Sequence, residues 1–139
     1  MLAARLYAGV TALALVAVWF AAPVGAQTPK QLDWCNGKNR ATPDLRIKGC
    51  TAVIQSGKFA GQNLAIAFVK RGHANYDKGQ FDRAIQDFDQ AIRLNPNYAA
   101  AFNDRSRAKD KKGDKAGAEA DLAAARRIDP NAGRWATPT

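Results

Sequence analysis

The stretch that decides the fold is residues 65–97, AIAFVKRGHANYDKGQFDRAIQDFDQAIRLNPN, because the chain nearly repeats it. Residues 99–131 read AAAFNDRSRAKDKKGDKAGAEADLAAARRIDPN. When the first stretch is slid onto the second, an offset of 34, the residues agree at thirteen of 33 positions. A period of this length is typical of a repeat unit built from two helices. The sequence therefore predicts two helix pairs in succession.

Helical spacing and stop signals give the bounds of these helices. In the first copy, apolar and small residues follow helical spacing over 65–76, and Gly79 provides a left-handed end. A second apolar stripe covers 81–92, and Pro96 stops it. Gly72 lies where the two antiparallel helices have to approach closely. We expect five helices and no sheet in the chain, with the helices near 43–56, 62–78, 81–94, 98–112 and 115–128.

The first copy resembles the tetratricopeptide repeat. The stretches AIAFVKRGHA at 65–74, GQFDRAI at 79–85 and AIRLNP at 91–96 carry the small, aromatic and proline positions of that family. The copy departs from the family at Asn75, where an aromatic residue is preferred. The resemblance implies an all-α fold, in which antiparallel helix pairs stack as a short α-solenoid of about two repeats after a degenerate N-terminal helical unit.

The second copy has the features of a terminal unit. Ser106, Lys109 and Lys115 replace residues that would pack on a next repeat or on the partner helix. A polar outer face is typical of the repeat that ends such an array. We therefore divide the chain into an N-terminal loop and degenerate helical unit over 27–64, repeats over 65–98 and 99–131, and a C-terminal tail over 132–139.

Two signals mark a helix in the N-terminal unit. Thr42 followed by Pro43 is a helix start, and Gly57 is a helix end. Between them, one apolar stripe includes Cys50. Trp34 and Cys35 precede this helix in a stretch that we interpret as a loop rich in Asn, Gly and Lys.

Residues 1–26 have the features of a secretory signal peptide. Arg5 is followed by an apolar run over 6–22 and a small-residue finish, so we expect cleavage before Gln27. An uncleaved anchor helix is the alternative. The chain is similar to small exported tetratricopeptide proteins of Gram-negative bacteria, which implies a periplasmic or secreted location. Export disfavours nucleic acid as a partner despite the formal charge of +9, and leaves anionic envelope components and acidic proteins.

Cys35 and Cys50 are the only cysteines of the chain. In an oxidising compartment, two cysteines of one chain commonly form a disulfide. We therefore expect one disulfide that fastens the loop around Cys35 onto the following helix. Two free thiols, one of them buried on a helix, are the alternative.

The composition gives no sign of an enzyme, a metal site or a cofactor. His73 is the only histidine, and no nucleophile–base pair that would need it is visible. Two cysteines alone cannot hold a tetrahedral zinc ion, and a single histidine excludes any two-histidine metal motif. The aspartates of the repeats are interpreted as helix-surface charges that pair with Arg83, Arg93 and Arg105; they are Asp82, Asp87, Asp89, Asp104 and Asp121.

The function is therefore expected on a surface. In the family, the first helices of the repeats line a concave groove that receives a peptide or helix of a partner protein. The candidate groove residues are Ile66, Val69, His73, Tyr76, Asp77, Asn103, Arg107, Asp110 and Lys111. For Ile66 and Val69, simple burial under the N-terminal helix is the alternative. The function that follows is a non-enzymatic adaptor that binds another protein. The alternative is an accessory subunit of an envelope assembly that contacts anionic partners through the basic run at 105–115.

Overall fold

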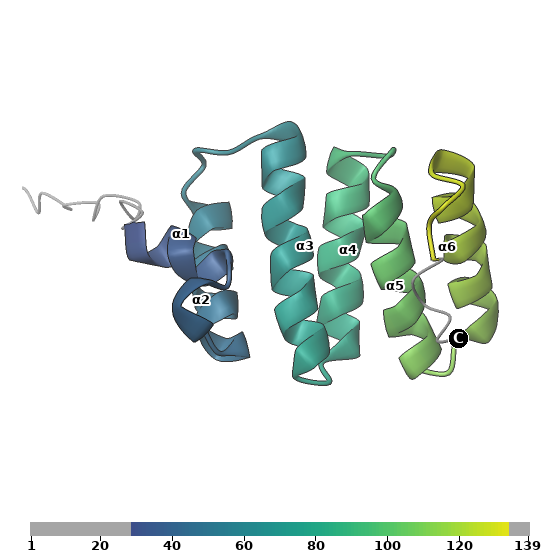
Figure 1. The fold of residues 1–139 in the computed structure, drawn as a ribbon, viewed down its shortest axis with the longest axis horizontal. Coiled ribbons are helices and arrows are strands. Elements are labelled where there is room, and N and C mark those ends of the chain that lie inside the picture. Colours follow the sequence, from purple (N-terminus) through teal and green to yellow (C-terminus); the bar gives the residue numbers. More distant parts are fainter. Residues whose placement is uncertain (1–28, 134–139) are drawn as a thin grey trace, which may run out of the picture.

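The computed structural model describes residues 29–133 (Figure 1). This part of the chain holds no strand, and its elements are α1 Pro29–Cys35, a 3-10 helix η1 Lys38–Arg40, α2 Pro43–Gln55, α3 Gly61–Asp77, α4 Phe81–Leu94, α5 Ala99–Lys111 and α6 Lys115–Ile128. The signal peptide expected over 1–26 and most of the tail lie outside the described residues. No helix within 29–133 has the length and apolar character needed to cross a membrane.

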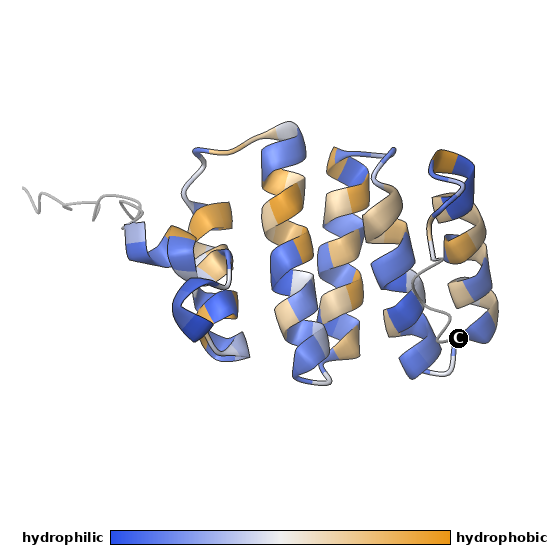
Figure 2. Cartoon of the chain, in the orientation of Figure 1, coloured by the Kyte–Doolittle hydropathy of each residue, from blue (hydrophilic) through white to orange (hydrophobic). Residues whose placement is uncertain are grey.

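The helices stand in a row from the α1–α2 end to α6 (Figure 1). Each helix packs on the next one along the chain, and the first helices of the two repeats, α3 and α5, also touch. Every helix carries both hydrophobic and hydrophilic residues (Figure 2). This arrangement of pairs confirms the prediction of an all-α fold with antiparallel helices stacked as a short solenoid.

The core of the solenoid lies between α3, α4 and α5, where small residues allow close helix packing. Phe88 of α4 is fully buried against α3. A Cβ atom added at Gly72 would lie 2.6 Å from Cε1 of Phe88, which is closer than real Cβ contacts. The predicted close approach at Gly72 is therefore confirmed, and the phenyl ring fills the space that a side chain would need.

The predicted helix ends agree with the observed ones to within one or two residues. Thr42 caps α2, because its hydroxyl oxygen accepts a hydrogen bond of 3.4 Å from the Leu45 N–H. Gly79 ends the first helix of repeat 65–98 with a φ of 72°. A left-handed φ of this kind favours glycine, because other residues carry a Cβ that clashes there.

The expectation of five helices and a loop around Trp34 and Cys35 is wrong, because these two residues belong to a sixth helix, α1. A disulfide joins Cys35 to Cys50 of α2, as expected. Gly49 lets α1 lie directly on α2, since a Cβ there would come within 2.5 Å of the Gln31 carbonyl oxygen. Residues 29–55 thus form a helix pair of their own, whose first helix has seven residues.

The aspartates of the repeats are not all surface charges. Asp87, Asp104 and Asp121 are buried, with exposed fractions of 4%, 8% and 5%. Asp89 and Asp121 bind Arg105 as expected, whereas Arg83 and Arg93 form no ion pair within the described part of the chain. Burial requires a partner, because an unpaired carboxylate is costly to remove from water.

The same ion pair recurs in both repeats. Arg71 of α3 donates to Asp87 of α4 at 2.7 Å from Nη2, and Arg105 of α5 donates to Asp121 of α6 at 2.6 Å from Nη2. Asn75 adds a hydrogen bond of 2.9 Å to Asp87. This bond gives Asn75 a structural role at the position where the copy departs from the family.

Polar side chains also connect the two helices of the second repeat, α5 and α6, although the sequence predicts them on an outer face. Ser106 is buried and donates a hydrogen bond of 2.7 Å to the Ala118 carbonyl. Lys109 reaches Asp121 at 2.9 Å. Both side chains therefore hold α5 on α6 instead of facing solvent. Of the three polar replacements, Lys115 is the exposed one.

Candidate functional site: a groove along α3 and α5

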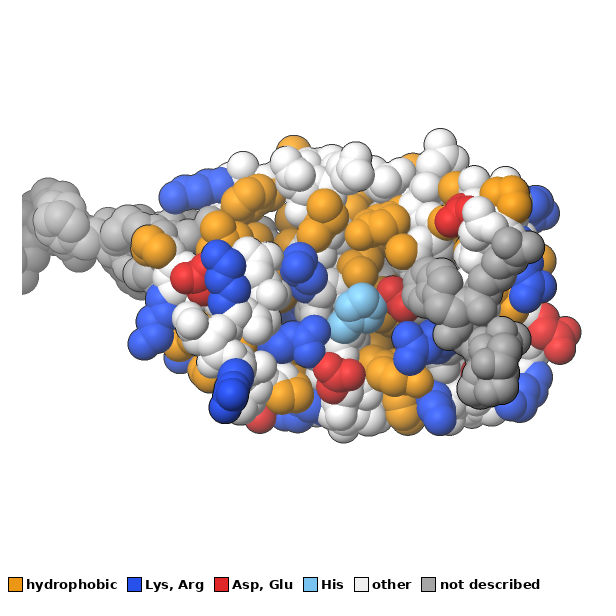
Figure 3. Space-filling model, viewed as in Figure 1, with side chains coloured by type: hydrophobic (Ala, Val, Ile, Leu, Met, Phe, Trp, Pro, Cys, Tyr) orange, Lys and Arg blue, Asp and Glu red, His pale blue; other side chains and the backbone are white. Residues whose placement is uncertain are grey.

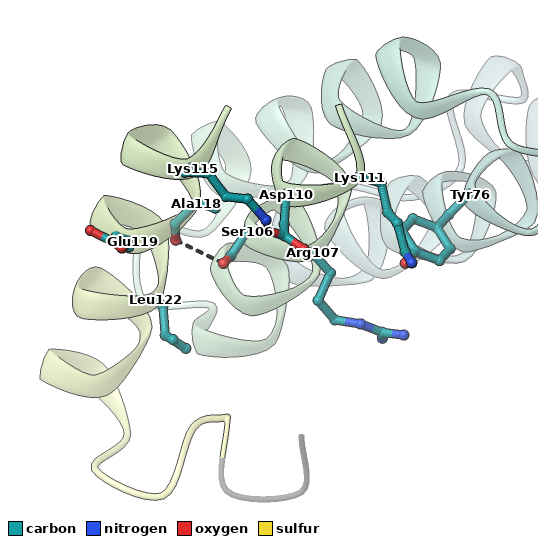
Figure 4. A pocket seen from close by; sticks show the side chains of 9 residues that line it. All are labelled: Tyr76, Ser106, Arg107, Asp110, Lys111, Lys115, Ala118, Glu119 and Leu122. Carbon is teal, nitrogen blue, oxygen red and sulfur yellow. Dashed lines mark hydrogen bonds and ion pairs between the residues drawn. The ribbon is translucent and has the colours of Figure 1, made fainter. Parts of the chain in front are cut away.

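Two adjoining hollows follow the first helices of the repeats. The first has a volume of about 420 Å³ and is lined by Arg46, His73, Tyr76, Asp77, Phe88, Ala100, Asp104 and Arg107. The second, of about 490 Å³, is lined by Tyr76, Ser106, Arg107, Asp110, Lys111, Lys115, Ala118, Glu119 and Leu122 (Figure 4). Because both hollows include Tyr76 and Arg107, they form one continuous surface, which we call the α3–α5 groove.

Tyr76 and Arg107 stand at the junction of the two hollows. The guanidinium carbon of Arg107 lies 5.3 Å from the centre of the Tyr76 ring, within the range of a cation–π contact. The Tyr76 and Phe81 rings pack in a T-shaped arrangement, with ring centres 5.3 Å apart. Arg107 keeps 55% of its side chain exposed, and it extends away from α5 in Figure 4. The junction therefore offers an aromatic face and a charged donor to whatever enters the groove.

His73 and Asp104 form the floor of the first hollow. The Nε2 atom of His73 lies 2.6 Å from Oδ2 of Asp104, and the imidazole and the Phe88 ring pack in a T-shaped arrangement. Asp104 has 10% of its side chain exposed and lies 3.6 Å from Arg107. Figure 3 shows this face, with basic and acidic side chains around the histidine.

The Ser106 hydroxyl is not placed beside His73. Ser106 lines the second hollow, and its hydroxyl donates to a backbone carbonyl of α6. His73 lines the first hollow, where it contacts Asp104. Within residues 29–133, no group of three His, Cys, Asp or Glu side chains is arranged to hold a metal ion.

Most acids of the groove are paired internally. Arg46 of α2 binds Asp77 at 2.8 Å. Lys115 binds Asp110 at 2.5 Å, and this hydrogen bond lowers the pKa of the Asp110 carboxyl. Among the described residues, Lys111 forms no ion pair. The groove therefore carries charges of both signs, with Arg107 and Lys111 as the cations best placed to meet a partner.

Six of the nine residues predicted for the groove do line it: His73, Tyr76, Asp77, Arg107, Asp110 and Lys111. Val69 lies in the core with 5% exposure, and Asn103 is buried with 4% exposure. Ile66 lines a separate apolar hollow beside the N-terminal helix pair. Val69 is therefore buried, but in the core against α4 and α5 and not under the N-terminal helix that the alternative named.

Several groove residues were not predicted from the sequence, and Arg46, Asp104 and Leu122 are examples. Arg46 comes from α2, which precedes the repeats, so no spacing within a repeat indicates it. The sequence predicts Asp104 as a surface charge and its neighbour Asn103 as a groove residue, whereas Asp104 lines the groove and Asn103 is buried. Leu122 comes from the second helix of its repeat and closes the far end of the groove.

Residues 65–98 match the family model of the tetratricopeptide repeat. No curated protein and no solved structure gives a significant match to this chain. The match supports the interpretation of this chain as a tetratricopeptide repeat protein. The six described α-helices and their packing in pairs agree with the solenoid of that family. Tetratricopeptide repeats generally mediate protein–protein interaction, and the family is generally non-catalytic.

Proposed function

We propose that this protein is an exported, non-enzymatic interaction module that binds a peptide or helical segment of a partner protein in the α3–α5 groove. The observation that carries the proposal is the continuity of the two hollows through Tyr76 and Arg107. A segment that lies across α3 and α5 would contact both residues at once. Tyr and Arg are enriched among the residues that dominate binding energy at protein interfaces.

The chemistry of the groove favours a partner segment with an apolar anchor next to an acidic group. The face of Tyr76 and the side chain of Leu122 supply apolar surface. Arg107 and Lys111 supply donors for a carboxylate. Because Asp77 and Asp110 already have partners, the groove does not need a cationic ligand to balance them.

Export is part of the proposal. The signal-like composition of residues 1–26 favours it. The disulfide between Cys35 and Cys50 supports it, because disulfides persist in oxidising compartments such as the periplasm. Both features favour a periplasmic or secreted location for the adaptor.

Most cations of the basic run at 105–115 form ion pairs within the protein. This favours the groove, and not the run as a whole, as the docking site. Lys112 binds Asp82, Lys115 binds Asp110, and Lys109 binds Asp121. Internal pairs of this kind reduce the charge that the turn presents to an anionic partner. Arg107, whose contact with Asp104 is longer at 3.6 Å and whose side chain is 55% exposed, and Lys111 both line the groove.

The test is affinity purification of partners from a periplasmic extract, with the processed protein and its variants as baits. Tyr76→Ala should weaken capture of the partner at all salt concentrations, because it removes an apolar anchor. Arg107→Ala should weaken it mainly at low salt, since screening reduces exposed charge contacts. Gln90→Ala, at an exposed position of α4, is the matched control and should capture the partner like wild type.

A specific outcome would overturn the proposal in favour of the envelope-assembly alternative. In that outcome, Tyr76→Ala and Arg107→Ala capture the partner like wild type, whereas the triple variant Lys111→Ala/Lys112→Ala/Lys115→Ala does not. The basic turn would then be the docking site.

A further inference from the structure

We propose that the α1–α2 end of the molecule docks on the surface of an anionic phospholipid bilayer through Trp34, Lys30 and Lys48, which we call the Trp34 patch. This patch lies at the end of the row opposite α6 (Figure 1) and shares no residue with the α3–α5 groove. Its role is therefore separate from partner binding, and either role can fail without the other.

Two lysines from different helices flank one indole ring. The Nζ atom of Lys30, on α1, lies 5.1 Å from the centre of the Trp34 ring, and that of Lys48, on α2, lies 5.9 Å from it. Both lysines are exposed, and neither forms an ion pair with a carboxylate of the described residues. A cation–π contact leaves the ammonium N–H groups free to donate to phosphate oxygens.

The patch is held rigidly before any ligand arrives. The disulfide between Cys35 and Cys50 fixes the end of α1 on α2. At Gly49, an added Cβ would lie 2.8 Å from the Cβ of Trp34, so the two helices are in direct backbone contact beside the ring. A preformed arrangement lowers the entropy cost of binding, because the side chains are already positioned.

The charge of this end matches an anionic surface. Residues 29–60 contain six Lys or Arg and two Asp, a balance of +4. The two aspartates are already engaged, Asp33 by Lys38 and Asp44 by Lys78. Figure 3 shows basic side chains at this end, as well as over the rest of the face. Anionic lipid attracts such clusters over a distance set by the salt concentration.

The indole ring favours a bilayer over an acidic protein or a soluble anion. Trp34 is partly exposed between two cations, which places an apolar ring beside phosphate-binding groups. Trp side chains prefer the headgroup level of a membrane, because one end of the ring is apolar and the other carries an N–H donor. Leu32, also on α1, is 40% exposed and adds apolar surface at the same end.

The position of the Trp34 patch in the chain also favours a bilayer as its ligand. The apolar run over 6–22 ends seven residues before α1 begins at Pro29. A segment that directs a chain to a membrane therefore precedes the patch immediately. The patch would keep this end of the processed protein on the bilayer surface.

The experiment measures binding of the processed protein to vesicles. One set of vesicles contains equal parts of phosphatidylglycerol and phosphatidylcholine, and the other contains phosphatidylcholine alone. The double variant Lys30→Gln/Lys48→Gln should lower the partition coefficient onto the anionic vesicles roughly 10- to 30-fold, since each cation near such a surface contributes a few-fold. The matched control Arg126→Gln/Arg127→Gln removes the same charge from exposed positions of α6, at the opposite end of the row, and should change it only about twofold.

Fluorescence of Trp34 gives a second readout that general charge attraction would not produce. Trp135 is replaced by Phe, so that Trp34 is the reporter in the processed chain. Its emission should shift to shorter wavelength on the anionic vesicles and stay unchanged with phosphatidylcholine alone. Equal losses in the two double variants, an unshifted emission or no preference for anionic vesicles would each overturn the proposal. An acidic protein or a soluble anion would then be the ligand to consider for this end.

Discussion

Arg105 donates two hydrogen bonds to Asp121, of 2.8 Å from Nε and 2.6 Å from Nη2. This pair joins the two helices of the second repeat. In the first repeat, Arg71 of α3 donates to Asp87 of α4 and joins those two helices in the same way. Arg105 also reaches back to Asp89 on α4 at 2.6 Å. One arginine therefore ties its own helix pair together and connects it to the pair before it.

The first prediction concerns Asp121. Burial alone would raise the pKa of its carboxyl, but the hydrogen bonds from Arg105 and Lys109 outweigh that effect and the pKa lies below its ordinary value. Asp121→Asn should lower the free energy of unfolding at neutral pH by roughly 3 kcal/mol, because it leaves buried cations without their anion. Urea titration of wild type and variant measures the difference.

The pH dependence of this difference has a definite sign. A group whose folded-state pKa is lowered stabilises the fold above its unfolded pKa, and this contribution is lost as the pH falls through the folded value. The gap between wild type and Asp121→Asn should therefore shrink below about pH 4. Asp82→Asn is the control, because Asp82 is exposed and its pair with Lys112 should contribute less than about 1 kcal/mol. A gap that widens in acid would contradict the assignment.

The second prediction compares one position in the two repeats. Gly72→Leu should cost about 1–3 kcal/mol or more, because the new side chain would overlap the Phe88 ring. Ser106 occupies the matching position, where Leu122 stands in place of the phenyl ring and an open hollow adjoins. Ser106→Leu should therefore cost less, even though it removes the hydrogen bond to Ala118. Equal losses in urea titrations would show that the helix contact is placed incorrectly.

The third prediction concerns the disulfide. Cys50→Ala should lower the free energy of unfolding by about 3 kcal/mol, the amount expected for opening a loop of 15 residues. Cys35→Ala should cost a similar amount, since either change removes the same bond. A reducing agent should bring wild type close to both variants. Peptide mapping of periplasmic protein under non-reducing conditions that finds two free thiols would refute the disulfide.

The sequence predicts the repeats well, because their signals are local and periodic. Gly79 and Pro96 mark helix ends, and the 34-residue period repeats them at Gly113 and Pro130. Helix α1 could not be found in this way. Its seven residues make only about two turns, and its position depends on contacts with Gly49 and Cys50 that are distant in sequence.

The candidate groove is harder to predict. Helical spacing shows which residues lie along one face of a helix, but it does not show which of them the neighbouring helices bury. His73 and Val69 lie four residues apart on α3, yet Val69 is buried against the core and His73 is partly exposed. The difference arises from the packing of α4 and α5 around α3. Arg46 enters the groove from a preceding helix, and only the tertiary structure brings it there.

The fourth prediction tests the groove itself and is the most direct measurement of the central claim. A photo-reactive benzoylphenylalanine is placed at Tyr76 in the groove, at Lys112 in the basic turn or at Gln90 on the exposed face of α4, and each protein is irradiated in the periplasm of living cells. All three positions are partly or fully exposed, so the three proteins should fold alike. We expect a covalent adduct with a partner protein from position 76, and none from position 90 or 112. An adduct from position 112 with none from position 76 would contradict the groove as the binding site.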